Sequence, residues 1–283
     1  MLELLESHAS FGGTQRIYRH ESKTVGLPMR FSVFLPEEAS QKKVPALFYL
    51  AGLTCTEETF PIKAGAQRFA AQHGIALISP DTSPRGAGVP DDTDAWDFGV
   101  GAGFYVDATQ APWSNHYRMY SYVRDELRET VIGELPIDGE RLGIFGHSMG
   151  GHGALVLALR NPDIYRSVSA FAPIAAPTRC PWGEKAFGGY LGTDREAWKQ
   201  YDASELIGKA SRKFAEGILV DQGMADQFLA QQLNPDVFEA ACEAAGQPLT
   251  LRRHEDYDHG YFFISTFIED HIRHHAQIFN SVR

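Results

Sequence analysis

The chain has 283 residues, 43% of them hydrophobic, which is enough to bury a large core as one large α/β domain or two small ones. No repeat, low-complexity run or linker-like stretch divides it, so a single domain over residues 1–283 is favoured. The net charge of −10 argues against a nucleic-acid ligand and against binding to an anionic membrane surface.

The cysteine content and the lack of long apolar segments indicate the cellular compartment of the protein. Cys55, Cys180 and Cys242 are odd in number and lack metal-site spacing, which favours a reducing environment over a disulfide framework. The N-terminal residues lack the basic start and apolar core of a signal peptide. No stretch approaches the roughly 18 continuous apolar residues of a membrane span. We therefore expect a cytoplasmic protein without membrane association.

The first 80 residues predict strands around one helix. Residues 1–40 are typical of antiparallel strands, with Met29–Pro36 alternating loosely and Gln15–His20 as its partner. Next come a continuous apolar strand, a loop, a helix ended by Gly74 and a second buried strand: Val44–Leu50, Ala51–Phe60, Ala64–His73 and Ile75–Ser79.

Two long irregular excursions follow, at residues 81–113 and residues 172–214. Loops of this length are uncommon inside a compact domain and are often functional. Regular elements are expected outside them: an amphipathic helix over 119–132, a strand at Leu142–Phe145, a helix at Met149–Arg160, strands at Ser167–Phe171, Gly217–Asp221 and Leu249–Arg253, a helix at Pro235–Ala245, and a last helix from Tyr261 to about Phe279.

The alternation of strands and helices predicts the fold class. It indicates an α/β protein whose mostly parallel sheet is covered by helices on both faces, with antiparallel N-terminal strands at one edge. In such a sheet the functional site lies at the carboxyl ends of the strands.

The segment Gly146-His147-Ser148-Met149-Gly150 indicates a nucleophilic serine. It follows an apolar strand and precedes an apolar helix, which is the setting of a G-x-S-x-G nucleophile elbow. In that motif the serine sits on a strained turn at the top of a sheet, and the small residues let strand and helix pass closely. Ser148 is therefore the candidate nucleophile.

A base is needed because a serine hydroxyl is a poor nucleophile at neutral pH. His259 is favoured, since it lies in the loop Asp256–Gly260 after a strand and just before a helix. The other downstream histidines are interpreted as packing near the site (His152), a strand end (His254) and a solvated face of the terminal helix, although their spacing could hold a metal (His271, His274 and His275).

Two aspartates compete for the acid that orients the base. Asp221 ends a predicted strand, and Asp226 opens the next segment, where it could instead cap a helix. Either could hold the second nitrogen of the histidine and stabilise the imidazolium, so position alone leaves both open. Oxyanion stabilisation needs two N–H donors. The amides of Met149, after the nucleophile, and of Leu53, after Gly52, are the candidates.

With these residues placed, the chain resembles the S-formylglutathione hydrolase family, also called esterase D, within the α/β-hydrolases. Five blocks spread over nearly the whole length carry the likeness: Leu50–Glu57, Pro80–Gly86, Gly146–Ala154, Pro181–Phe187 and Tyr257–Phe262. The family pattern places its nucleophile on Ser148, its acid on Asp226 and its base on His259. The resemblance implies hydrolysis of the thioester S-formylglutathione to formate and glutathione without a metal or other cofactor, in a homodimer.

Two positions depart from the family pattern, and one thiol lies close to the site. Gly260 and Ala51 each replace a serine, and neither change touches a catalytic group. Cys55 follows the oxyanion loop. The resemblance suggests that it is a non-catalytic thiol whose modification could block the pocket.

The substrate pocket is less well defined by sequence. A formyl group needs only a small pocket, which aromatic residues of the two excursions could close: Trp96, Phe98, Trp113 and Trp182. The two glutathione carboxylates call for cations, and the candidates are Lys63, Arg85, Arg179 and Lys185. The alternatives are a general short-chain carboxylesterase, an acyltransferase and a catalytically inactive binding module.

Overall fold

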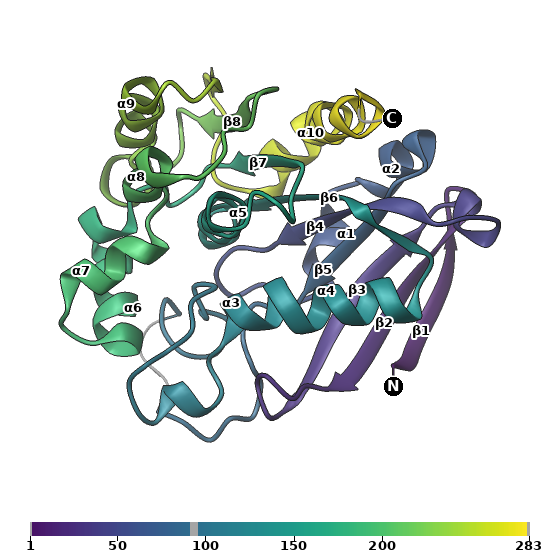
Figure 1. The fold of residues 1–283 in the computed structure, drawn as a ribbon, viewed down its shortest axis with the longest axis horizontal. Helices are drawn as coiled ribbons and strands as arrows, with labels where there is room; N and C mark the ends of the chain where they lie inside the picture. Colours follow the sequence, from purple (N-terminus) through teal and green to yellow (C-terminus); the bar gives the residue numbers. More distant parts are fainter. Residues whose placement is uncertain (1, 91–95, 282–283) are drawn as a thin grey trace.

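The computed structural model describes residues 2–90 and 96–281. In these ranges one sheet has nine strands in the order β1-β2-β3-β5-β4-β6-β7-β8-β9 (Figure 1). The strands are β1 (Glu3–Ser10), β2 (Gly13–Glu21), β3 (Pro28–Leu35), β4 (Val44–Leu50), β5 (Ala76–Pro80), β6 (Ile137–His147), β7 (Ser167–Phe171), β8 (Ile218–Gly223) and β9 (Leu249–His254).

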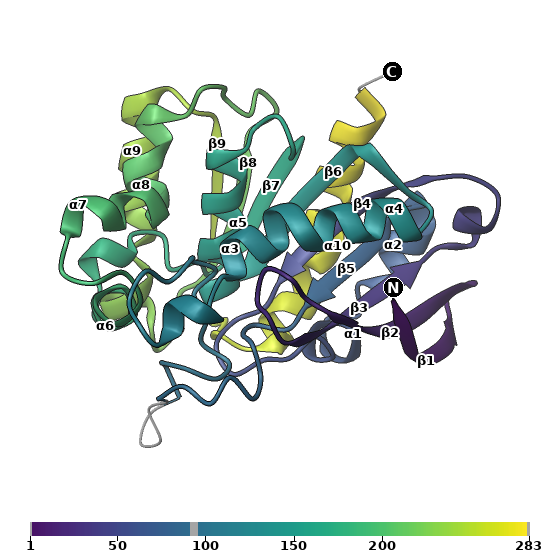
Figure 2. The same cartoon turned by 60° about the horizontal axis from the view of Figure 1, so that its bottom comes forward.

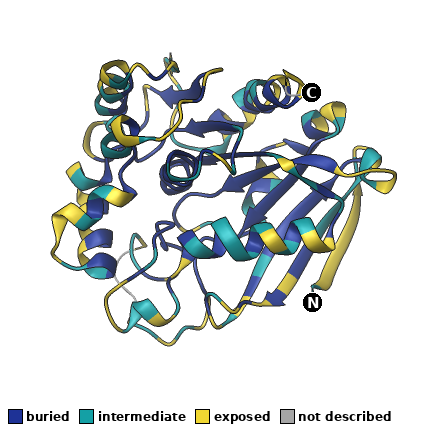
Figure 3. Cartoon of the chain, viewed as in Figure 1, coloured by how far each residue is buried: buried dark blue, intermediate teal, exposed yellow. Residues whose placement is uncertain are grey.

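The predicted mixed sheet is confirmed. From β5 through β4, β6, β7 and β8 to β9, neighbouring strands are parallel. β1, β2 and β3 pair antiparallel, and β3 joins β5 antiparallel. Every residue of β4 is buried, as expected for a strand covered on both faces, whereas β1 at the edge is mostly exposed (Figure 3).

Helices cover both faces of the sheet. In Figure 2, α4 and α5 lie in front of the sheet and α10 lies behind it. No helix in the described part of the chain has the length and apolar run needed to cross a bilayer. The helices are α1 (Thr59–Lys63), α2 (Gln67–His73), α3 (Met119–Ser121), α4 (Arg128–Glu134), α5 (Met149–Arg160), α6 (Pro181–Leu191), α7 (Arg195–Trp198), α8 (Ala203–Leu206), α9 (Pro235–Ala245) and α10 (Tyr261–Ser281).

Several predicted bounds differ from the structure. The helix expected over 64–73 begins at Gln67, after the separate short helix α1. The helix expected over 119–132 widens into a π-helical segment at Tyr122–Leu127 between α3 and α4. The second excursion is not irregular throughout, because it contains α6, α7 and α8. Residues 91–95 of the first excursion lie outside the described residues.

The prediction that His271, His274 and His275 form a solvated face was wrong. His271 and His275 have no exposed surface, and His274 is half-buried. Hydroxyls of the neighbouring strand β7 contact two of them: Ser167 contacts His275 Nδ1 at 2.6 Å, and Ser169 contacts His275 Nε2 at 2.9 Å and His271 Nδ1 at 2.8 Å. Burial of α10 against β7 therefore overrides the polar pattern. The described residues contain no cluster of His, Cys, Asp or Glu suited to a metal.

Candidate active site

Ser148 occupies the sharp turn between β6 and α5. Its φ of 58° and ψ of −119° are uncommon for a residue with a side chain and store strain. The Ser148 amide donates to the Phe171 carbonyl at 3.0 Å, which holds the turn. A Cβ on Gly150 would lie 1.9 Å from the Leu50 carbonyl oxygen, so only glycine fits there. The strand–turn–helix context expected for a nucleophile elbow is present.

The loops after β8 and β9 bring Asp226 and His259 together. His259 Nδ1 donates to Asp226 Oδ2 at 2.5 Å, and the Asp226 side chain has no exposed surface. The Phe228 amide donates to Asp226 Oδ1 at 2.8 Å and fixes the carboxylate. Because Nδ1 carries the proton, Nε2 of His259 is left as the nitrogen that can accept one.

Asp221, the other aspartate left open by position, has different partners. Its carboxylate binds the Arg252 guanidinium through two bonds of 2.6 and 2.5 Å and lies 3.4 Å from His271 Nε2. Burial raises the pKa of Asp221, but hydrogen bonds from His271 and Arg252 outweigh it and hold that pKa well below its usual range. Of the two aspartates, Asp226 is therefore the one that contacts His259.

A second histidine lies against His259. The ring of His147, the residue before the nucleophile, is centred 4.4 Å from the His259 ring. Burial, and secondarily the charge of His259, lower the pKa of His147 well below its ordinary value, so it is neutral at neutral pH. Its proximity was not predicted, although its place inside the G-x-S-x-G motif was a usable signal. His152 is also buried, and its Nε2 donates to the Phe104 carbonyl at 2.9 Å.

A small cavity of about 130 Å³ lies beside Ser148. Pockets for drug-sized ligands are typically about 300–1,000 Å³, so this one suits a short group. Its edge is aromatic: the ring of Trp182 lies 5.4 Å from Trp96 and 4.7 Å from Phe228. The lining residues are Gly52, Leu53, Cys55, Trp96, His147, Ser148, Trp182, Phe228 and His259.

The structure separates the predicted pocket aromatics into two groups. Trp96 and Trp182 line the cavity, and Phe228, which sequence reasoning missed, completes their cluster. Phe228 lies two residues after Asp226, so its position in the acid loop was the available signal. Phe98 and Trp113 instead pack on Tyr190, with Phe98 stacked at 4.6 Å. They belong to the packing of the excursions.

The predicted cations are not among the described residues that line the cavity. Arg85 binds Asp81 at 2.7 Å, Lys185 binds Asp97 at 2.5 Å and Arg179 binds Glu205 at 3.3 Å. Lys63 lies over the Tyr261 ring at 5.8 Å. Contact of these cations with the carboxylates of a substrate stays a prediction.

The two amides predicted to form an oxyanion hole flank the cavity region. Leu53 lines the cavity, and Met149 begins α5 directly after Ser148. Among the described residues, neither amide donates a hydrogen bond, which leaves both available to a developing oxyanion.

Cys55 lines the same cavity and is half-buried. Burial raises the pKa of its thiol, although hydrogen bonds with Thr59 and Tyr261 oppose that rise. A raised pKa disfavours the thiolate, which is the nucleophilic form, so the thiol is poorly activated.

We expect the variant Cys55→Ala to keep most of its turnover and to resist iodoacetamide, whereas the unsubstituted enzyme loses activity as the adduct fills the cavity. Residual ester hydrolysis after timed incubation measures this. Cys180 and Cys242 are 1% exposed and serve as internal controls, because they stay in both proteins. Near-complete loss of turnover on removing the Cys55 thiol would show that it takes part in the chemistry.

Comparisons with known proteins identify the family. A family model described as "Putative esterase" matches residues 22–274. The S-formylglutathione hydrolases of Mus musculus and Rattus norvegicus are 53% and 52% identical over 281 residues, with 99% of each chain covered. The solved structure of an S-formylglutathione hydrolase from Agrobacterium tumefaciens is 47% identical, has a TM-score of 0.94, and covers 97% of this chain and 98% of its own. The chain therefore has the α/β-hydrolase fold and belongs to the S-formylglutathione hydrolase family of esterases.

Proposed function

We propose that this chain hydrolyses the thioester S-formylglutathione to formate and glutathione, with Ser148 as nucleophile, His259 as base and Asp226 as the acid that orients it. The observation that carries the proposal is the 2.5 Å hydrogen bond between His259 and Asp226 at a cavity that His259 shares with Ser148. The family of the chain supports the choice of substrate, because its relatives are named for S-formylglutathione.

In the first half of the reaction, Ser148 Oγ attacks the carbonyl carbon of the thioester while His259 Nε2 takes the hydroxyl proton. The carbonyl oxygen becomes an oxyanion that the amides of Leu53 and Met149 stabilise. Collapse of the tetrahedral intermediate breaks the carbon–sulfur bond. A thiol has a pKa near 8.5, far below that of an alcohol, so the carbon–sulfur bond breaks readily. The His259 imidazolium gives the proton taken from Ser148 to the departing thiolate, so glutathione leaves as the thiol and His259 is neutral again before water enters.

In the second half, His259 removes a proton from water, and the hydroxide attacks the formyl ester on Ser148. The ester bond breaks, Ser148 recovers its proton from His259, and formate leaves. Asp226 stabilises the imidazolium in both halves because its carboxylate accepts from His259 Nδ1. His147 remains neutral throughout and places no competing fixed charge beside the base.

The dimensions of the cavity favour a short acyl group. A formyl group fits within about 130 Å³ next to Ser148, whereas a longer acyl chain must displace the aromatic cluster of Trp96, Trp182 and Phe228. Each methylene that fits or fails to fit a pocket is worth about 1–3 kcal/mol, or roughly 10–200-fold in specificity.

The test is a substrate panel of formyl, acetyl and butyryl thioesters of glutathione beside the same acyl groups as 4-nitrophenyl esters. We expect kcat/KM to fall at least about tenfold for each step in acyl length and to be highest for S-formylglutathione. The half-exposed residue Trp96 allows the pocket to be opened without removing core packing, so Trp96→Ala raises the ratio of butyryl to formyl turnover.

Trp113→Ala is the matched control, since Trp113 is a part-buried tryptophan of the same excursion outside the cavity. Equal turnover of glutathione thioesters and plain esters across all acyl lengths would instead assign the chain as a general short-chain carboxylesterase. The continuous sheet from β1 to β9 supports the proposal that residues 1–283 act as one catalytic domain. A homodimer and a cytoplasmic location stay predictions.

A further inference from the structure

The loop that carries the Leu53 amide is strained. This oxyanion loop, residues 51–58, lies between β4 and α1, and within it Thr54 has a φ of 68°. A threonine is β-branched and rarely adopts positive φ, so the conformation is strained and persists only where neighbouring groups fix it. Because Thr54 directly follows Leu53, relaxation of this residue would rotate the Leu53 amide away from its present direction.

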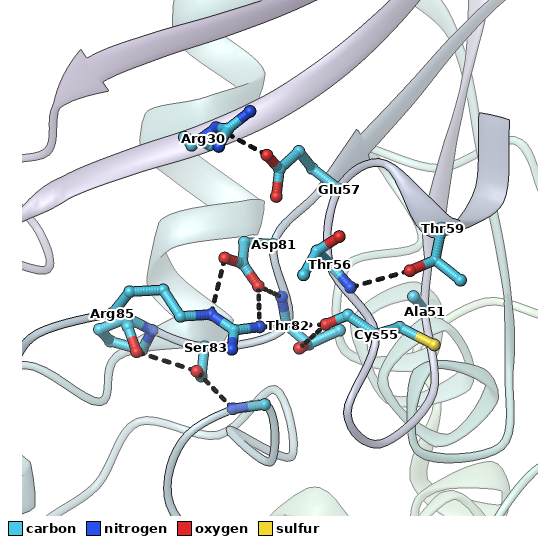
Figure 4. A network of polar contacts seen from close by, with 12 residues as sticks. Arg30, Ala51, Cys55, Thr56, Glu57, Thr59, Asp81, Thr82, Ser83 and Arg85 are labelled. Carbon is cyan, nitrogen blue, oxygen red and sulfur yellow. Dashed lines mark hydrogen bonds and ion pairs between the residues drawn. The ribbon is translucent and has the colours of Figure 1, made fainter. Parts of the chain in front are cut away.

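The segment 81–85 holds the oxyanion loop at the carbonyl of Cys55 (Figure 4). Thr82 Oγ1 donates to this oxygen at 2.6 Å, and Arg85 Nη2 donates to it at 3.2 Å. Both donors therefore fix the peptide between Cys55 and Thr56, one residue beyond Thr54. Segment 81–85 lies in the second of the five sequence blocks, and the proposed chemistry assigns no role to it.

Asp81 fixes the direction of the Arg85 guanidinium. Asp81 is 4% exposed and accepts from Arg85 Nε at 2.9 Å and from Arg85 Nη2 at 2.7 Å. Its Oδ1 also accepts from the Thr82 amide at 2.7 Å. A planar guanidinium bound through two nitrogens has a set orientation, which a lysine ammonium would not have. The hydrogen bonds with Asp81 raise the pKa of Arg85 further, so it remains charged.

The same segment also holds the other side of Thr54. The Thr54 amide donates to the Gly101 carbonyl at 2.9 Å, and the Gly101 amide donates to Ser83 Oγ at 2.8 Å. Thr54 Cα is only 3.1 Å from where a Gly101 Cβ would lie, so glycine allows this approach. Segment 81–85 therefore fixes the strained residue from both sides.

We propose that Arg85, oriented by Asp81, is a positioning residue that holds the Cys55 carbonyl and thereby aims the Leu53 amide into the oxyanion hole. This role rests on the proposed function of the site and differs from the glutathione contact predicted from sequence. Arg85 is not among the described residues that line the cavity, and it acts on the reacting atoms only through the oxyanion loop.

The two roles of Arg85 predict different kinetics. We expect Arg85→Gln to lower kcat about 10–100-fold, less than the roughly 10²–10³-fold cost of deleting an oxyanion donor outright, because the amide is displaced and not removed. The fall is equal for S-formylglutathione and for 4-nitrophenyl acetate, and KM stays within about twofold for both. Arg85→Lys keeps the charge but loses the bidentate orientation, so it recovers only part of kcat.

Asp81→Asn tests whether the pair acts as a unit. It leaves the guanidinium present but unoriented, so it lowers kcat on both substrates, and the double variant with Arg85→Gln is no worse than the more severe single variant. Arg68→Gln, which removes an exposed guanidinium on α2, is the control. Circular dichroism and thermal melting report the folded fraction, and Arg85→Lys supplies the kinetic comparison if Arg85→Gln does not fold.

The contrary result is clear. If Arg85→Gln raises KM for S-formylglutathione alone and leaves kcat on 4-nitrophenyl acetate unchanged, Arg85 binds the glutathione moiety and the positioning role is wrong. Equal kcat in all these variants also overturns it. An unsubstituted enzyme that hydrolyses the ester but not the thioester would refute the proposed substrate and leave the comparison on the ester intact.

Discussion

The variant Ser148→Ala should lose about 10⁴- to 10⁶-fold in kcat on both S-formylglutathione and short esters. Among the described residues that line the cavity, no other group has both the position and the activation to replace the serine. Cys55 lines the same cavity, but burial raises its pKa, and its hydroxyl neighbours Thr59 and Tyr261 are not general bases. His259 and Asp226 would remain hydrogen-bonded to each other, without a hydroxyl to deprotonate.

Steady-state turnover measured at high enzyme concentration, together with labelling by a fluorophosphonate, checks this expectation. The label should attach to the unsubstituted protein and not to Ser148→Ala, whereas Ser7→Ala, which removes an exposed hydroxyl from β1, should label and turn over normally. Thermal melting separates chemistry from folding, because the substituted residue would need the same positive φ as the serine. Near-normal turnover in a folded Ser148→Ala protein would refute the proposed mechanism as a whole.

Local patterns in the sequence predicted the parts of the site that local structure fixes. The bounds of α5 and β7 agree with the expected Met149–Arg160 and Ser167–Phe171, because apolar runs, glycines and a closing proline are read within one element. The turn at Ser148 was predictable for the same reason. Its glycines are required by contacts with the adjacent strand β4, and the motif carries that requirement in five residues.

Contacts between distant elements were not predictable from local patterns. Asp221 and Asp226 are five positions apart and have the same charge. Only the packing of β8 beside β9 places Arg252 against Asp221 and His259 against Asp226. The buried face of α10 was predicted to be exposed because the serines that contact its histidines, Ser167 and Ser169, lie about a hundred residues earlier in the chain. The residue spacing on a helix shows which side chains share a face, but not whether that face packs against another element or is exposed to solvent.

The buried histidines make a second large effect predictable, namely loss of stability in mild acid. Burial lowers the pKa of six histidines: to about 4 for His152 and His274, well below the ordinary value for His147 and His275, and below the ordinary value for His20 and His271. In the unfolded chain their pKa values return to about 6.5. Between about pH 6.5 and pH 4 the unfolded state therefore binds more protons than the native state.

The sign of the effect follows from this difference. Stability rises with pH wherever the unfolded state binds more protons, so the free energy of unfolding falls as the pH drops below about 6.5. Each histidine contributes up to about 1.4 kcal/mol per pH unit, and the six together approach the about 5–15 kcal/mol of a typical domain within one to two units. Asp221, whose pKa is held low in the native state, adds its loss only below about pH 5, once the unfolded carboxylate begins to protonate.

Urea unfolding at pH 8, 7, 6 and 5 measures this dependence, and we expect a nearly constant free energy above pH 7 and a loss of several kcal/mol by pH 5. His274→Gln removes one partly buried titrating group, so its slope should be shallower by up to about 1.4 kcal/mol per pH unit. His8→Gln, the same exchange at an exposed position of β1, is the control for the substitution itself. A free energy of unfolding that stays flat from pH 7 to pH 5 would contradict this prediction. It would mean that the folded protein takes up as many protons as the unfolded chain, although burial lowers the pKa values of these histidines.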